Sequence, residues 1–172
     1  MKFSWGEGDW YLVEDDAFLA DVSAHFGGEQ SEFARFLEEE SKKRWGYDGA
    51  LTISWEELRQ KIIRYENFAL KHPSLPETKS TIEPDIYRFL SFYLLGIDNT
   101  PAYDHYPLYA KSNQGVGKID PKLLKSYENF FKENKDSRFY PLIQNVYNIL
   151  KKHDLTWNDE LAAYLKSKSI FQ

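Results

Sequence analysis

Residues 84–96 read PDIYRFLSFYLLG, and this stretch decides the fold class. Apolar side chains would fall on almost every side of a helix formed here, which is typical of a helix that is buried all round. Pro84 suits the first turn of that helix, where no backbone hydrogen bond is lost to it, and Gly96 suits the end. The stretch therefore predicts a central buried helix.

Helical patterns also dominate on both sides of this segment. Ser54 and Glu57 have the spacing of a capping box, in which each side chain bonds the backbone amide of the other residue. Asp120 before Pro121 is a second helix start. Strand-like alternation is scarce. We therefore expect an all-α bundle of about seven helices, over the approximate ranges 16–25, 31–44, 54–71, 84–95, 120–135, 140–153 and 156–168.

Two segments depart from the helical pattern. Residues 1–13 hold aromatic residues around Gly6 and Gly8, and they predict an extended or irregular lead-in whose rings pack on the body of the protein. Residues 98–119 contain two prolines and two glycines, and they predict one long loop. A loop of this length inside a compact domain is commonly functional.

The chain of 172 residues fits one helical domain over residues 1–172. Residues 72–80, HPSLPETKS, are bounded by prolines and interrupt the helical pattern. This connection offers a hinge between two sub-layers, residues 1–72 and 81–172.

The residue inventory excludes several classes of protein. There is no cysteine, so disulfides, thiolate metal sites and cysteine nucleophiles are ruled out, and a reducing compartment is the natural setting. No run of 18 apolar residues occurs, and the N-terminal stretch lacks the apolar core of a secretory signal. We expect a cytoplasmic protein without a membrane partner.

Charge is unevenly distributed along the chain, whose net charge is −5. Residues 1–100 hold 11 basic and 19 acidic side chains, for −8, whereas residues 101–172 hold 11 basic and 8 acidic ones, for +3. The acidic half argues against wrapping of duplex DNA, but a local basic face in the second half could meet phosphates.

Motifs for catalysis and metal binding are missing. Residues 115–118 read GVGK, but the full phosphate-loop pattern is absent and Ile119 stands where its hydroxyl residue belongs. No GxSxG motif occurs either. The histidines are isolated from one another: His25, His72, His105 and His153. We therefore expect no catalytic residues, no metal site and no cofactor.

The loop at residues 98–119 is the best candidate for a binding site. Flat aromatic rings, amide groups and cations are interleaved there, a mixture that suits contact with nucleic acid or with a partner. Lysines at the start of the next helix could add contacts to phosphates. The candidate residues are Tyr103, Tyr106, Tyr109, Lys111, Asn113, Lys118, Lys122 and Lys125. An alternative is a proline-braced loop whose tyrosines pack back under the helices.

A family resemblance begins at the same place. Residues 87–95, YRFLSFYLL, followed by YPLY at 106–109, resemble helical regions attached to the AAA+ motors of modification-dependent restriction systems of the McrB type. They are also similar to helical glycosylase-like segments, although Ala110 and Lys111 stand where an acidic residue follows the turn in that pattern. The first resemblance implies an N-terminal targeting module of a larger protein with a nucleotide-hydrolysing motor, and a modified DNA ligand.

Three hypotheses follow for function. The first is a non-enzymatic DNA-recognition or specificity domain of a prokaryotic defence protein of the restriction type. The second is a protein–protein adaptor that docks a partner through aromatic-rich helices, with the acidic first half as its contact face. The third is a small hydrolase or transferase with a scattered site, which would show a deep pocket with convergent polar groups. Oligomeric state stays open.

Overall fold

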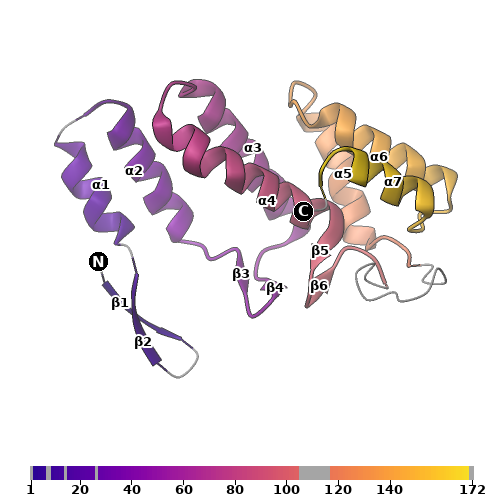
Figure 1. The fold of residues 1–172 in the computed structure, drawn as a ribbon, viewed down its shortest axis with the longest axis horizontal. Coiled ribbons are helices and arrows are strands. Elements are labelled where there is room, and N and C mark those ends of the chain that lie inside the picture. Colours follow the sequence, from indigo (N-terminus) through magenta and orange to yellow (C-terminus); the bar gives the residue numbers. More distant parts are fainter. Residues whose placement is uncertain (1, 7–8, 14, 26, 105–116, 171–172) are drawn as a thin grey trace. The chain divides into compact units, whose positions relative to one another are not determined.

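The chain is all-α, as expected. The computed structural model describes residues 2–6, 9–13, 15–25, 27–104 and 117–170, and within them it has seven α-helices and three small two-stranded sheets (Figure 1). The expected number of helices is confirmed. No helix in these ranges is both long and apolar enough to cross a membrane.

The chain divides into two compact units. The first contains residues 1–44 together with 74–77, and the second contains residues 45–73 and 78–172. The division therefore follows Arg44 and does not separate residues 1–72 from 81–172. The physical reason is that the helices on either side of the proline-rich connection pack against each other within the second unit.

The first unit holds a β-hairpin and a pair of helices. Its elements are β1 (Lys2–Gly6), β2 (Asp9–Val13), α1 (Asp16–Ala24) and α2 (Gly28–Ser41). The lead-in is thus extended, one of the two forms expected for it, and it is not irregular: Lys2 pairs with Val13 and Trp5 with Trp10 in an antiparallel register. The polar–apolar alternation of β1 around Ser4 allows this pairing. Asp15 caps α1 by accepting from the Phe18 amide at 3.4 Å.

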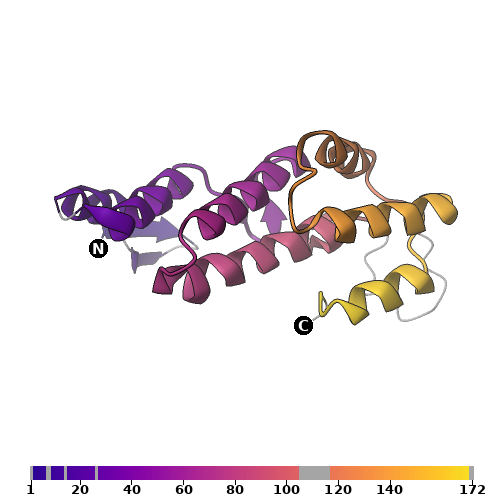
Figure 2. The same cartoon turned by 90° about the horizontal axis from the view of Figure 1, so that it is seen from above.

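A long helix and the helix predicted to be buried form the centre of the second unit. The latter is not buried all round as expected, because its Tyr87 is 53% exposed. The elements are α3 (Trp55–Lys71), a π-helical turn η1 (Thr78–Ile82) and α4 (Glu83–Leu95). The capping box predicted at Ser54 and Glu57 is present. Thr78 Oγ1 donates to the carbonyl of His72 at 2.6 Å, which ties the two ends of the connection together. Helices α3 and α4 lie side by side (Figure 2).

Two short hairpins lie in the chain directly before α3 and directly after α4. The strands are β3 (Gly46–Tyr47), β4 (Ala50–Leu51), β5 (Gly96–Ile97) and β6 (Thr100–Pro101). The Leu51 amide donates to Thr100 Oγ1 at 3.0 Å, and the Asn99 amide donates to the Gly49 carbonyl at 2.8 Å. Each turn therefore supports the other, although neither hairpin is long enough to be stable alone.

Three helices complete the second unit: α5 (Pro121–Glu133), α6 (Tyr140–Lys152) and α7 (Asp159–Ser167). Their inward positions are fully buried, as in Leu123, Ile143 and Leu161, each with no exposed area. The Tyr93 ring of α4 meets Tyr127 of α5 edge-on, with centroids 5.1 Å apart. Tyr127 Oη donates to the Tyr93 carbonyl at 3.1 Å. These aromatic residues are core packing.

Candidate functional site

Tyr103 lies in the core and does not form a stacking surface. Only 1% of its area is exposed, and its ring meets Trp157 edge-on with centroids 5.0 Å apart. The prediction that Tyr103 contacts bases is therefore wrong. Tyr106, Tyr109, Lys111 and Asn113 lie outside the described residues.

The backbone explains why Tyr103 points inward. Tyr103 and Ile119 form an antiparallel bridge, and the Asp104 amide donates to the Lys118 carbonyl at 2.9 Å. Residues 103–104 and 118–119, which lie on either side of residues 105–116 in the sequence, are thus paired. Burial raises the pKa of the Tyr103 phenol well above its ordinary value. Its hydroxyl has no hydrogen-bond partner within the described part of the chain.

The three predicted site lysines that the structure describes are exposed: Lys118, Lys122 and Lys125. Lys125 forms an ion pair with Glu128 at 3.2 Å. For the ammonium groups of Lys118 and Lys122, no ion pair occurs with any residue that the structure describes. Both lie close in sequence to the start of α5, where Asp120 Oδ1 accepts from the Lys122 amide at 2.7 Å. Two of the eight predicted residues are therefore exposed cations without a described acidic partner.

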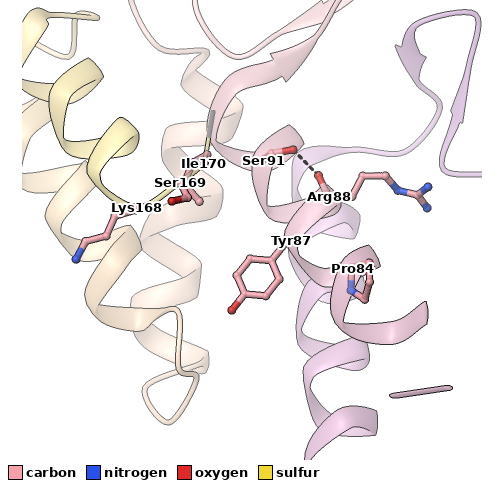
Figure 3. Close-up of a pocket in the computed structure, with 7 residues that line it drawn as sticks. All are labelled: Pro84, Tyr87, Arg88, Ser91, Lys168, Ser169 and Ile170. Carbon is pink, nitrogen blue, oxygen red and sulfur yellow. Dashed lines mark hydrogen bonds between the residues drawn. The ribbon is translucent and has the colours of Figure 1, made fainter. Parts of the chain in front are cut away.

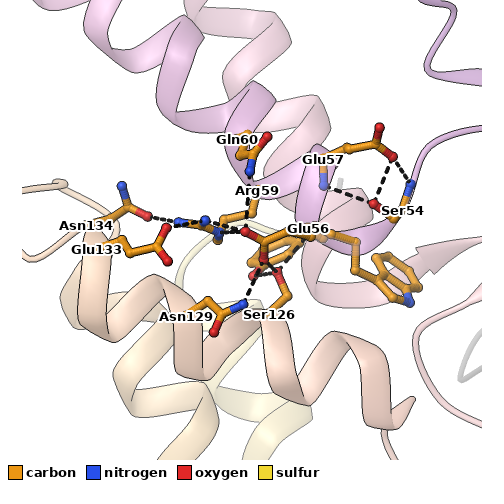
Figure 4. A network of polar contacts seen from close by, with 11 residues as sticks. Ser54, Glu56, Glu57, Arg59, Gln60, Ser126, Asn129, Glu133 and Asn134 are labelled. Atoms are coloured by element: carbon orange, nitrogen blue, oxygen red, sulfur yellow. Dashed lines mark hydrogen bonds and ion pairs between the residues drawn. The ribbon is translucent and has the colours of Figure 1, made fainter.

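A partly buried polar network joins α3 to α5 (Figure 4). Arg59 has a side chain that is only 3% exposed, and it forms ion pairs with Glu56 and with Glu133, the latter at 2.6 Å. It also donates to the side chain of Asn134. A buried guanidinium needs a partner for each of its N–H groups. These contacts supply such partners and explain why a cation is tolerated there.

Glu56 is the acidic centre of this network. Its carboxylate also accepts from Ser126 Oγ at 3.2 Å and from Asn129 Nδ2 at 3.3 Å. Burial opposes ionisation of Glu56, but the hydrogen bonds from Arg59, Asn129 and Ser126 outweigh it and lower the pKa. The pair Glu56 and Glu57, which the helix dipole alone could explain, therefore has two structural roles: Glu57 caps α3, and Glu56 fixes α5 to α3.

An open pocket of about 520 Å³ lies between α4 and the turn that follows α7 (Figure 3). Its walls are formed by Pro84, Tyr87, Arg88, Ser91, Lys168, Ser169 and Ile170. None of these seven residues carries a carboxylate or an imidazole. The pocket therefore lacks the groups that most often serve as general acid or base, and it does not support the hydrolase or transferase hypothesis.

Two of the polar side chains around this pocket, Ser91 and Arg88, are engaged elsewhere. Ser91 Oγ donates to the Arg88 carbonyl at 2.7 Å. The Arg88 guanidinium pairs with Asp85 at 3.0 Å and lies 5.4 Å from the centre of the Trp45 ring. In Figure 3 the side chains of Tyr87 and Arg88 leave α4 in different directions. The described residues also include no cluster of three potential metal ligands.

An exposed apolar surface on α1 was not among the predicted site residues. Phe18, Leu19 and Val22 are 58%, 44% and 38% exposed. With about 100° of rotation per helical residue, they fall within one stripe, and Ala20 falls on the opposite side. Ala20 is buried at 4%, in a helix that packs on α2. We name Phe18, Leu19 and Val22 the α1 face.

The signal for the α1 face is present in the sequence. Helix α1 reads DAFLADVSA, which places apolar residues on both sides of a nine-residue helix. A helix that is apolar all round is usually covered on all sides, and in the described structure only one side is.

Residues 1–172 match no protein-family model, no curated protein and no solved structure.

Proposed function

We propose that the chain is a protein-binding adaptor whose contact surface is the α1 face. The observation that supports this function is the grouping of exposed apolar side chains. Six large hydrophobic side chains are exposed in the described residues, and three of them are Phe18, Leu19 and Val22. Exposed apolar residues that occur singly need no explanation, but a contiguous group is typical of an interaction site.

The energetics favour a partner at this position. Covering a Phe, Leu or Val side chain removes apolar area from water, and each contributes about 1.5–3 kcal/mol when fully buried. A rigid helix presents these side chains with little loss of backbone entropy on binding. An exposed phenylalanine within such a stripe has the character of an interface anchor.

Site-specific photo-cross-linking tests the proposal. Leu19 is replaced by benzoylphenylalanine in the full chain, which is then irradiated in cells of the source organism. We expect a discrete adduct of higher mass. The matched control places the same group at Leu70, which is 68% exposed on α3. No adduct at position 19, or the same adduct from both positions, would refute the adaptor function.

DNA recognition is a second candidate, supported by the exposed cations Lys118 and Lys122. Such a function would fit the targeting module of a restriction-type defence protein that the resemblance implies. Phosphate contacts by lysine release counterions, so the affinity should fall steeply as salt rises. These two lysines would position the backbone of the nucleic acid without reading its sequence.

Fluorescence anisotropy with labelled single-stranded, duplex and methylated duplex DNA tests this candidate. Lys118→Ala combined with Lys122→Ala should weaken binding to every probe. Lys151→Ala on α6 is the matched control, because Lys151 is an exposed lysine that lies 5.9 Å from the centre of the Tyr147 ring. Absence of binding at low salt would exclude DNA recognition.

A further inference from the structure

We infer that the partner of the α1 face presents a basic amphipathic helix, with apolar residues on one side and lysine or arginine around them. This inference rests on the proposed adaptor function and adds the chemistry of the partner. It is carried by the combination of the exposed apolar stripe with the charge of the unit to which the stripe belongs.

The first unit is strongly acidic. Residues 1–44 contain eleven Asp and Glu side chains against five Lys and Arg, which gives −6. The whole chain has a net charge of −5, so this quarter of the sequence carries more net negative charge than the chain as a whole. A unit with this field attracts cationic partners and speeds their association.

Acidic groups also lie next to the apolar stripe itself. Asp21 is exposed and follows Phe18 by three residues, so these two side chains are neighbours on the surface of α1. The acidic N-terminal end of α1 adds Asp15, which is half-buried as the cap. The surroundings of the stripe therefore favour a cationic rim on the partner.

The same charge disfavours a second copy of this chain as the occupant. Two copies that met through the α1 face would bring together two units of −6 each, and like charges placed opposite each other oppose association. Three side chains also provide too little area for a stable interface, which buries about 800 Å² per partner. The polar rim must therefore contribute, and here the rim is acidic.

Titration with designed peptides tests the inference. The probe is a helical peptide of about 18 residues, five turns of helix, with leucine on one face and lysine on the other. The paired probe carries glutamate at every lysine position. Binding to the full chain is measured by calorimetry, and the contact residues are identified from amide shifts in ¹⁵N NMR spectra.

We expect the lysine peptide to bind and to shift the amides of residues 16–24, and the glutamate peptide not to bind. Phe18→Ser combined with Val22→Ser should weaken binding by about tenfold or more, as expected for interface anchors. Leu70→Ser should leave it unchanged. Asp21→Lys should weaken the binding of the lysine peptide, whereas Asp98→Lys in the β5–β6 turn should not.

Two results would overturn the inference. Equal binding of both peptides would show that charge does not select the partner. Binding of the lysine peptide that shifts amides outside residues 16–24, or that survives the Phe18 and Val22 changes, would show that it attaches elsewhere. If the cross-link at position 19 forms while the lysine peptide fails to bind, the basic partner is refuted and the adaptor function is retained. If both fail, the adaptor function itself is refuted.

Discussion

Trp55 and Asp120 are joined by a hydrogen bond of 2.8 Å from the indole Nε1 to Oδ2 of the carboxylate, across 65 positions of sequence. The other oxygen of Asp120 caps α5 through the Lys122 amide. One carboxylate therefore begins α5 and fixes that helix to the first residue of α3.

Replacing Asp120 should separate these two roles. Asp120→Ala removes the cap and the indole contact, and we expect a loss of about 2 kcal/mol in the free energy of unfolding, with about 1 from each. Asp120→Asn keeps an oxygen for the cap but turns an amide NH₂ toward the indole, so the loss should be about 1 kcal/mol. Urea denaturation measures both. Equal losses would show that only one role contributes.

The Glu56–Arg59 network should make stability depend on pH. The pKa of Glu56 is lowered from 4.5 in the folded chain, so its stabilising contribution is complete above pH 4.5 and is lost as the pH falls through the lower folded value. We expect the difference in urea midpoint between the wild type and Glu56→Gln to be largest at pH 7 and to shrink below pH 4.5. Lys125→Ala, which removes only an exposed ion pair, is the control. A difference that is constant with pH would contradict this account.

Gly96 should not tolerate any side chain. Its φ is +83°, and an added Cβ would lie 2.3 Å from the Ala102 nitrogen and 2.6 Å from the Thr100 carbonyl oxygen. Gly96→Ala combines left-handed strain with a backbone clash, and we expect a loss on the order of 3 kcal/mol. Gly49→Ala is the control, because Gly49 has a φ of +67° but ordinary contacts, so it should lose only about 1 kcal/mol. Similar thermal shifts for both would show that the clash relaxes.

The hydroxyl of Tyr103 should be dispensable. Since it is buried without a described hydrogen-bond partner, Tyr103→Phe should leave stability unchanged or raise it by up to about 1 kcal/mol. Tyr127→Phe removes the bond to the Tyr93 carbonyl and should cost about 1 kcal/mol. Thermal unfolding of the two variants distinguishes these effects. A comparable loss from both would show that the Tyr103 hydroxyl is bonded.

The helices could be predicted from sequence because their ends are determined locally. The capping box at Ser54, Asp120 before Pro121 and Gly96 after α4 each act over a few residues, and each is present where the pattern placed it. The apolar character of residues 86–95 predicted burial of α4 correctly for most of its residues, but Tyr87 is 53% exposed, so the helix is not buried all round.

The candidate site was less predictable because exposure depends on distant partners. Tyr103 sits in a polar, proline-containing stretch, but its pairing with Ile119 and its contact with Trp157 turn it inward. The sequence pattern of its helix places Arg59 on the surface. It is buried because Glu133 and Asn134, at the end of α5, contact its guanidinium. The opposite holds for the α1 face, since three apolar residues in a helix normally indicate core.

The hydrogen bonds between Asp104 and Lys118 have a consequence for protein engineering. The Asp104 amide donates to the Lys118 carbonyl at 2.9 Å, and the Lys118 amide donates to Oδ2 of Asp104 at 3.3 Å, so these two residues are held together at one clasp. The entropic cost of closing a loop rises only with the logarithm of its length, by about 0.6 kcal/mol for each doubling. Because Asp104 and Lys118 hold each other directly, the clasp is a natural place to test loops of different length between them.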